Sequence, residues 1–181
     1  MRVPRTFVFV DLSGFTNYTA AYGDDAAGRI LAAFRSIARQ VASERGVRIA
    51  KWLGDGCMVV AVDQADAITF AIELEEKATE VCAPLTARVG MATGYALLFE
   101  GDDYIGSAVN MAARLCDAAD PFEVLIPTMQ LERLPAGIVT APHAPLVLRG
   151  FPGEVDVVEL SGSVEEAPDT DEVWTRPRFN V

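Results

Sequence analysis

The sequence predicts one mixed α+β domain built around a mainly antiparallel sheet. Strand-like and helical segments alternate along the chain, and turns rich in Gly and Asp-Gly join neighbouring strand-like segments as they do in hairpins. The chain has 181 residues, 51% of them hydrophobic, which is enough apolar material for one core. We therefore expect a single compact unit over residues 1–160.

Strands are expected where β-branched and aromatic residues cluster between turn signals. The first is the unbroken apolar run TFVFV, which suggests a strand buried on both faces and which we expect to end at Asp11. Turns at Gly54-Asp55-Gly56 and Thr93-Gly94 separate later pairs, a further turn is expected at residues 100–103, and a final hairpin is expected around residues 150–153. The predicted strands are Thr6–Val10, Val47–Trp52, Cys57–Val62, Leu85–Met91, Tyr95–Phe99, Val124–Ile126, Leu146–Leu148 and Val155–Leu160.

Helices are expected where apolar residues recur at helical spacing. The longest, about Asn17–Glu44, contains a break at residues 22–25, and Gly46 is expected to close it with a left-handed cap. The other predicted helices are Gln64–Thr79, Gly106–Ala118 and a short one within Pro127–Arg133. Residues 161–181 are polar, acidic and aperiodic, so we expect a mobile tail there.

Composition excludes several classes of function. The net charge of −11 opposes binding to nucleic acid, and the longest apolar run, Cys57–Val62, is too short to cross a membrane. The three cysteines lack metal-site or disulfide spacing, which favours a reducing, cytoplasmic location. The one histidine, His143, has no partner for a Ser-His-Asp triad, so carboxylates must carry any chemistry.

Asp11 and Asp55 are the first candidates. Asp11 follows a strand and Asp55 lies at a hairpin tip, so pairing of the two strands would bring both carboxylates to one end of the sheet. Such a pair suits Mg²⁺. The alternative is that Asp11 caps the following helix and Asp55 only forms the Asp-Gly turn. The loop Leu12–Thr16 enters a helix, where its N–H groups could hold a phosphate, although with one glycine it matches no phosphate-loop motif.

Two further pairs could contact a ligand. Lys51 interrupts an apolar run, either as an edge residue reaching solvent or as a donor aimed at a purine, and Asp103 is either a turn residue or an acceptor for an exocyclic amine. Asn110 and Arg114 share one helix face among small residues. They are either solvent-facing or donors that stabilise phosphoryl charge.

Taken together, the motifs resemble the catalytic domain of the class III nucleotidyl cyclases. The resemblance runs from about Thr6 to Leu160 through FVFVDLSGFT, IAKWLGDGCMV, ARVGMATG, DYIGSAVNMAARL and LRGFPGEVDVVEL, in the family's order. It implies a ferredoxin-like, palm-like βαββαβ core flanked by helices, with α/β additions at the C-terminal end.

The resemblance also implies roles for individual residues. Asp11, Asp55 and the carbonyl of Leu12 match the ligands of two Mg²⁺ or Mn²⁺ ions, and Lys51 and Asp103 match the purine-reading pair of adenylyl cyclases. Asn110 and Arg114 match the groups that position the ribose and meet the α-phosphate. The positions matched to the rest of the triphosphate are Arg88, Arg149, which stands where many members have Lys, and the loop residues Ser13, Gly14, Phe15 and Thr16.

The implied activity is conversion of ATP to 3′,5′-cyclic AMP and pyrophosphate. Family sites form between two domains, and this chain carries the positions for both, so the resemblance implies a homodimer with two composite sites. The chain could be a free-standing cyclase or a fragment of a longer one. The rival interpretation is a catalytically silent, nucleotide-binding homodimer that acts as a sensor or scaffold. A diguanylate-type cyclase lacks its GG[DE]EF run here, and guanylyl cyclase activity stays open only as a side activity.

Overall fold

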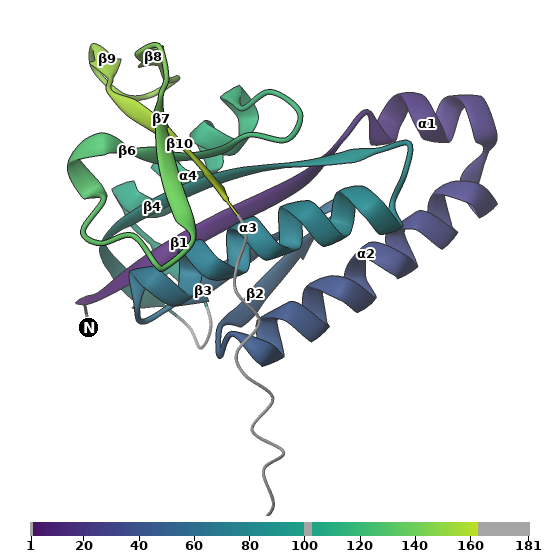
Figure 1. Cartoon of the computed structure of the whole chain (residues 1–181), viewed down its shortest axis with the longest axis horizontal. Coiled ribbons are helices and arrows are strands. Elements are labelled where there is room, and N and C mark those ends of the chain that lie inside the picture. Colours follow the sequence, from purple (N-terminus) through teal and green to yellow (C-terminus); the bar gives the residue numbers. More distant parts are fainter. Residues whose placement is uncertain (1, 100–102, 163–181) are drawn as a thin grey trace, which may run out of the picture.

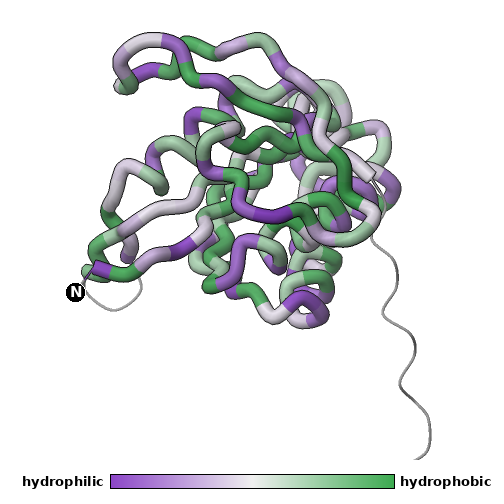
Figure 2. The backbone as a smooth tube through the Cα atoms, turned by 60° about the vertical axis from the view of Figure 1, so that its left-hand side comes forward, coloured by the Kyte–Doolittle hydropathy of each residue, from purple (hydrophilic) through white to green (hydrophobic). Residues whose placement is uncertain are grey.

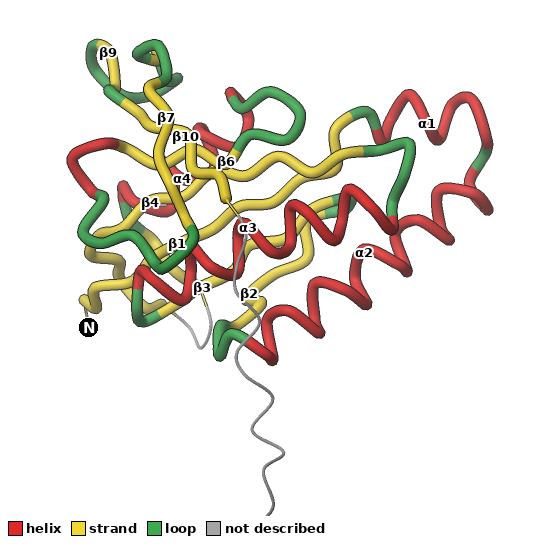
Figure 3. The backbone as a smooth tube through the Cα atoms, viewed as in Figure 1, coloured by secondary structure: helices red, strands yellow, loops and turns green. Residues whose placement is uncertain are grey.

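The computed structural model describes residues 2–99 and 103–162, and its centre is an eight-stranded sheet. The strand order is β2-β3-β1-β4-β6-β10-β7, with β5 pairing to β4 outside this order (Figures 1 and 3). Within it β4 and β6 run parallel and the other neighbours are antiparallel. The strands of this sheet are β1 (Arg2–Ser13), β2 (Arg48–Leu53), β3 (Gly56–Ala61), β4 (Thr86–Phe99), β5 (Asp103–Ile105), β6 (Val124–Pro127), β7 (Ile138–Pro142) and β10 (Val157–Gly162). The mixed α+β fold class is confirmed.

Helices cover both faces of the sheet. The helices α2 (Asp24–Glu44) and α3 (Gln64–Val81) run side by side over one face, and α4 (Ser107–Ala118) lies behind the sheet in the view of Figure 1. The helix α1 (Phe15–Tyr22) follows β1, and a 3₁₀ turn, η1, spans Thr128–Gln130. The predicted break before α2 is confirmed at Gly23, and Gly46 has the predicted left-handed conformation, with φ of 64°.

The central strand β1 shows why the sheet needs helices on both faces. Val8, Val10 and Leu12 are buried with residues of α2 and α3, whereas Phe7 is buried with residues of α4. Figure 2 shows many hydrophobic segments, in green, running through the interior of the molecule. Because side chains alternate between faces along a strand, the unbroken apolar run predicted a strand buried on both sides, and this is confirmed.

Two predicted strand ends are wrong. Asp11 does not end β1, which continues to Ser13 because it stays paired with β4 along its whole length. The two strands expected on either side of Thr93-Gly94 are one continuous strand, β4. Thr93 pairs with Thr6 and Gly94 with Arg5, so a long neighbour overrides the local turn signal.

The last predicted hairpin is also partly wrong. A short hairpin does form between β8 (Leu146–Val147) and β9 (Glu154–Val155). The strand β10, however, leaves that hairpin to pair with β6 and with β7, a strand that the sequence analysis did not predict. Its buried residue Leu160 packs in the main core, so burial decides the pairing.

Some predictions fall on residues that are not described. The expected turn at residues 100–103 lies outside the described residues except for Asp103, which begins β5. The expected tail likewise lies outside them from residue 163 onward, whereas Ser161 and Gly162 belong to β10. Within the described ranges, no helix is both long enough and apolar enough to cross a membrane.

Candidate functional site

Strand pairing brings Asp11 and the Asp55 turn together. Asp11 lies on the central strand β1, opposite Gly56 of β3 on one side and Arg88 of β4 on the other. Asp55 immediately precedes Gly56 in the turn between β2 and β3. A Cβ at Gly56 would overlap the carbonyl oxygen of Val10, so only glycine lets this turn approach β1.

Arg35 supports the Asp55 turn from α2. Its Nη2 donates to the carbonyl of Gly54 at 3.3 Å, and its guanidinium lies 5.1 Å from the ring centroid of Trp52. This contact was not predicted. Arg35 lies in the middle of α2, and a sequence pattern alone gives no sign of which turn it meets.

Arg88 forms the strongest polar contact at this end of the sheet. Its Nε and Nη2 donate to Oδ2 of Asp11 at 3.0 and 2.7 Å, while Nη1 donates to the main-chain carbonyls of Asp117 and Ala119 at 3.1 and 3.5 Å. Arg88 therefore ties Asp11 to the C-terminal end of α4. The sequence analysis matched Arg88 to a phosphate-binding position and did not predict its pairing with Asp11, which depends on strand register.

The electrostatics of Asp55 suit a cation site. Burial raises the pKa of Asp55, and the negative charge of Asp11 raises it further, while a backbone hydrogen bond and Arg88 oppose the shift. Two neighbouring carboxylates fit Mg²⁺ or Mn²⁺, which use one or two carboxylates together with substrate phosphates and water. Within the described residues, no group of three or more His, Cys, Asp and Glu side chains forms a metal site. The pair would therefore need further oxygen ligands, such as the main-chain carbonyl of Leu12.

The predicted phosphate loop lies directly beyond Asp11. Ser13 ends β1, Gly14 precedes α1 with φ of 85°, and Phe15 and Thr16 form the first turn of the helix. No side chain caps the N-terminus of α1, and the buried hydroxyl of Ser13 has no hydrogen-bond partner among the described residues. Donors in this turn are therefore available to an anion.

Lys51 and Asp103 are brought together from β2 and β5. Nζ of Lys51 forms an ion pair with Oδ1 of Asp103, although the two residues are far apart in sequence. Both side chains are about half exposed, at 46% and 50%. The half-exposed head group of Lys51 fits the interpretation of an edge residue that reaches solvent, and Asp103 begins β5.

Asn110 and Arg114 line a pocket of about 410 Å³ on the outer side of α4. Arg149 lines it from the loop after Leu148, together with three residues that the sequence analysis did not assign: Ser107, Gly150 and Phe151. Arg114 also pairs with Asp117 at 2.8 Å. The helix α4 can lie this close to the sheet because Gly90 of β4 has no side chain. A Cβ at this position would overlap the backbone of α4.

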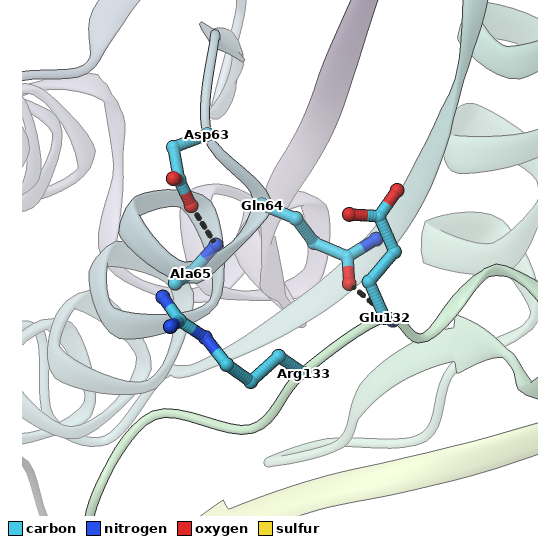
Figure 4. A pocket seen from close by; sticks show the side chains of 5 residues that line it. All are labelled: Asp63, Gln64, Ala65, Glu132 and Arg133. Carbon is cyan, nitrogen blue, oxygen red and sulfur yellow. Dashed lines mark hydrogen bonds between the residues drawn. The ribbon is translucent and has the colours of Figure 1, made fainter.

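A second pocket, of about 340 Å³, lies beyond the other end of β3 and is lined by Asp63, Gln64, Ala65, Glu132 and Arg133 (Figure 4). Gln64 is buried there and makes three hydrogen bonds. Its Nε2 donates to Oγ1 of Thr93 and to the carbonyl of Gln130, both at 2.7 Å, and its Oε1 accepts from the amide of Glu132 at 2.8 Å. The amide is fully satisfied, which indicates a structural role.

The cysteines do not contribute reactive groups. Cys57, Cys82 and Cys116 are buried and unpaired by disulfides. Burial raises the pKa of Cys57 and of Cys116 to about 12, so both remain thiols at neutral pH.

Several proteins of known name or structure are similar to this chain. No protein-family model matches it. An uncharacterized protein of Mycobacterium tuberculosis is 35% identical over 152 residues, covering 84% of this chain and 40% of the relative. An adenylate cyclase of Streptomyces coelicolor is 33% identical over 126 residues, covering 70% and 33%. The chain thus spans less than half the length of these relatives.

Solved structures show the same fold. The crystal structure of the adenylyl cyclase CyaB from P. aeruginosa superposes with a TM-score of 0.80 at 24% identity, covering 92% of this chain and 98% of that one. The guanylyl cyclase Cya2 superposes with a TM-score of 0.73 at 21% identity, covering 94% and 96%. The chain therefore shares the fold of these cyclase domains and is similar in sequence to relatives named adenylate cyclase, in keeping with the resemblance of its motifs to the class III nucleotidyl cyclases.

Proposed function

We propose that this domain is an adenylyl cyclase that converts ATP to 3′,5′-cyclic AMP and pyrophosphate. The observation that carries the proposal is the Lys51–Asp103 ion pair, because it joins two residues whose chemistry suits adenine. Lys51 can donate to N1 of adenine and Asp103 can accept from the N6 amine, whereas N1 of guanine is a donor and O6 an acceptor. The base-binding pair therefore favours ATP over GTP.

The pocket on α4 suits the sugar and phosphates. Asn110 would orient the ribose, and Arg114 would donate to the α-phosphate as its charge develops. Arg149 would meet the rest of the triphosphate, together with the N–H groups of residues 13–16. In the reaction the 3′-oxygen bonds to the α-phosphorus, the bond from that phosphorus to the β-bridging oxygen breaks, pyrophosphate leaves, and the 3′-hydroxyl proton passes to water.

Asp11, Asp55 and the Leu12 carbonyl would hold two Mg²⁺ or Mn²⁺ ions. When bound, such ions lower the pKa of a coordinated hydroxyl and neutralise phosphate charge. The two carboxylates, one of them with a pKa raised by burial and by its neighbour, must both be ionised to serve as ligands. Cation binding should therefore weaken as the pH falls through the pKa of Asp55.

We further propose that the working site is shared between two copies of the chain. The α4 pocket presents Asn110, Arg114 and Arg149, and none of the described residues that line it carries a carboxylate. This half-site supplies cations for a triphosphate but no ligands for the accompanying metal ions. A second copy would supply Asp11 and Asp55, giving a symmetric dimer with two sites.

Complementation tests both parts of the proposal. Asp11→Asn and Arg114→Ala alone should each keep no more than about 1% of wild-type activity in an assay of Mn²⁺-dependent cyclic AMP formation. Random pairing of equal amounts should restore about a quarter of wild-type activity, because half of the dimers then carry one intact site of two. Absence of recovery in demonstrated heterodimers would contradict the shared site. Absence of turnover in demonstrated wild-type dimers would instead favour a silent nucleotide-binding module.

A further inference from the structure

Arg88 forms an ion pair with Asp11, one of the carboxylates that the proposed function assigns to metal ions. It contacts Oδ2 of Asp11 through both Nε and Nη2, at 3.0 and 2.7 Å, and the two side chains are each 28% exposed. Such a two-point contact between ionised groups is stronger and more directional than an ordinary surface ion pair. In this conformation Asp11 already has a cation as its partner.

The rest of the Arg88 guanidinium is held independently of Asp11. Nη1 donates to the carbonyls of Asp117 and Ala119, at the C-terminal end of α4. A guanidinium released by Asp11 would therefore keep partners, and the carbonyl end of a helix is a favourable place for a positive charge. The local structure thus allows Arg88 to exist in either a bound or a released position.

A divalent cation and Arg88 compete for the same negative charge. A metal ion held by Asp11 would be close to the guanidinium that contacts this carboxylate, and repulsion between the two cations would oppose its binding. Both Arg88 donors contact Oδ2 of Asp11, so Oδ1 is the oxygen of this carboxylate that Arg88 leaves available to a metal ion. Full use of the carboxylate by two ions requires Arg88 to leave.

We propose that Arg88 acts as an internal counter-cation that lowers the affinity of the nucleotide-free protein for divalent metal ions. This inference rests on the proposed metal role of Asp11. Arg88 is a positioning residue in this respect, because it acts through Asp11. Its effect is to hold the carboxylate neutralised until a metal ion displaces it.

The test is Mn²⁺ binding by the full chain without nucleotide, with free Mn²⁺ measured by electron paramagnetic resonance. Arg88→Gln should bind Mn²⁺ about tenfold more tightly than the wild type, because one neighbouring positive charge is removed. Arg29→Gln makes the same change of net charge at an exposed position on α2 and should change the affinity less than about twofold. Asp11→Asn should lose the site.

The outcomes separate this inference from the proposed function. Equal or weaker binding by Arg88→Gln, with a wild-type site that depends on Asp11, overturns the counter-cation role and leaves the proposed metal site intact. In that case Arg88 would orient Asp11 instead. Absence of Asp11-dependent Mn²⁺ binding in every variant overturns both.

A measurement on the wild type covers the case in which Arg88→Gln does not fold. The Nε–H resonance of Arg88 can be identified by its loss in Arg88→Lys. Titration with diamagnetic Mg²⁺ should shift this resonance and speed its exchange with water as the contact with Asp11 breaks. An unchanged resonance at Mg²⁺ saturation overturns the proposal.

Discussion

Two polar clusters lie at opposite ends of β3, and they differ in how their groups are satisfied. At the end that begins with Gly56, Asp55 lies near Asp11, and burial together with the charge of Asp11 raises the pKa of Asp55. Past the other end of the strand, Gln64 places its donors and acceptor on three neutral partners at 2.7–2.8 Å. The cluster at Asp55 contains carboxylates that repel each other, whereas the cluster at Gln64 has its polar groups paired in hydrogen bonds.

The difference distinguishes a site from a support. A buried, fully paired amide stabilises one conformation and leaves nothing to bind a ligand. Neighbouring carboxylates destabilise the fold unless cations balance them, and Arg88 supplies one positive charge against the two carboxylates here. An incompletely balanced cluster of this kind is a property of sites that bind a ligand. Pocket volume alone would not separate the clusters, because the pocket beside Gln64, about 340 Å³, is similar in size to the 410 Å³ pocket on α4.

The largest expected effect is at Asp11. Asp11→Asn should lower kcat/KM for cyclic AMP formation about 1,000-fold, equivalent to about 4 kcal/mol, because the proposed metal ligand is lost. Asp25→Asn, an exposed change at the start of α2, should stay within about twofold of the wild type. Near-normal activity in Asp11→Asn would contradict the proposal that the carboxylate cluster binds the metal ions needed for the reaction.

Arg114 should show the next largest effect. Arg114→Ala should lower kcat about 100-fold with little change in KM, because the guanidinium is proposed to act on charge that develops in the transition state. Arg133→Ala is the matched control, since Arg133 lines the pocket beside Gln64. Steady-state kinetics of both variants check this. If Arg133→Ala were the more damaging change, the two pockets would have been assigned the wrong way round.

Gln64 should affect stability rather than catalysis. Gln64→Leu should lower the free energy of unfolding by about 2–4 kcal/mol, because the amide of Glu132 and the carbonyl of Gln130 lose their buried partner. Glu132→Gln changes only an exposed side chain and should have little effect. Urea denaturation measures both, and loss of activity in a Gln64 variant of normal stability would contradict the structural role.

The smallest expected change in stability is a gain at Asp55. The folded state raises the pKa of Asp55. At a pH above this raised pKa, the ionised carboxylate lowers the free energy of unfolding. At a pH below it, the carboxyl group is neutral and this cost is absent. Asp55→Asn should therefore raise Tm at pH 7 by less than about 3 °C while abolishing activity. The gain should vanish as the pH falls and wild-type Asp55 becomes protonated. A lower Tm at pH 7 would show that the carboxylate stabilises the turn.

Much of the candidate site could be predicted because its residues stand in local motifs. Asp11, Asp55, Asn110 and Arg114 were selected as candidates from their expected positions after a strand, at a turn and on a helix face. The contacts of Arg88 with Asp11 and of Arg35 with Gly54 were not predicted, since each joins residues that are distant in sequence. Gly150 and Phe151 were missed for the same reason, whereas Ser107 lies on α4 with Asn110 and was not assigned.

The sequence alone determined the types and order of most elements, because hydrophobic periodicity and turn residues act over a few positions. Tertiary structure decided which segments distant in sequence pair with one another. The strand β4 runs unbroken through Thr93-Gly94, β10 pairs with β6 and β7, and Asp11 faces Arg88. These outcomes depend on strand register and burial. Both are set by the whole core, and no short segment contains the information.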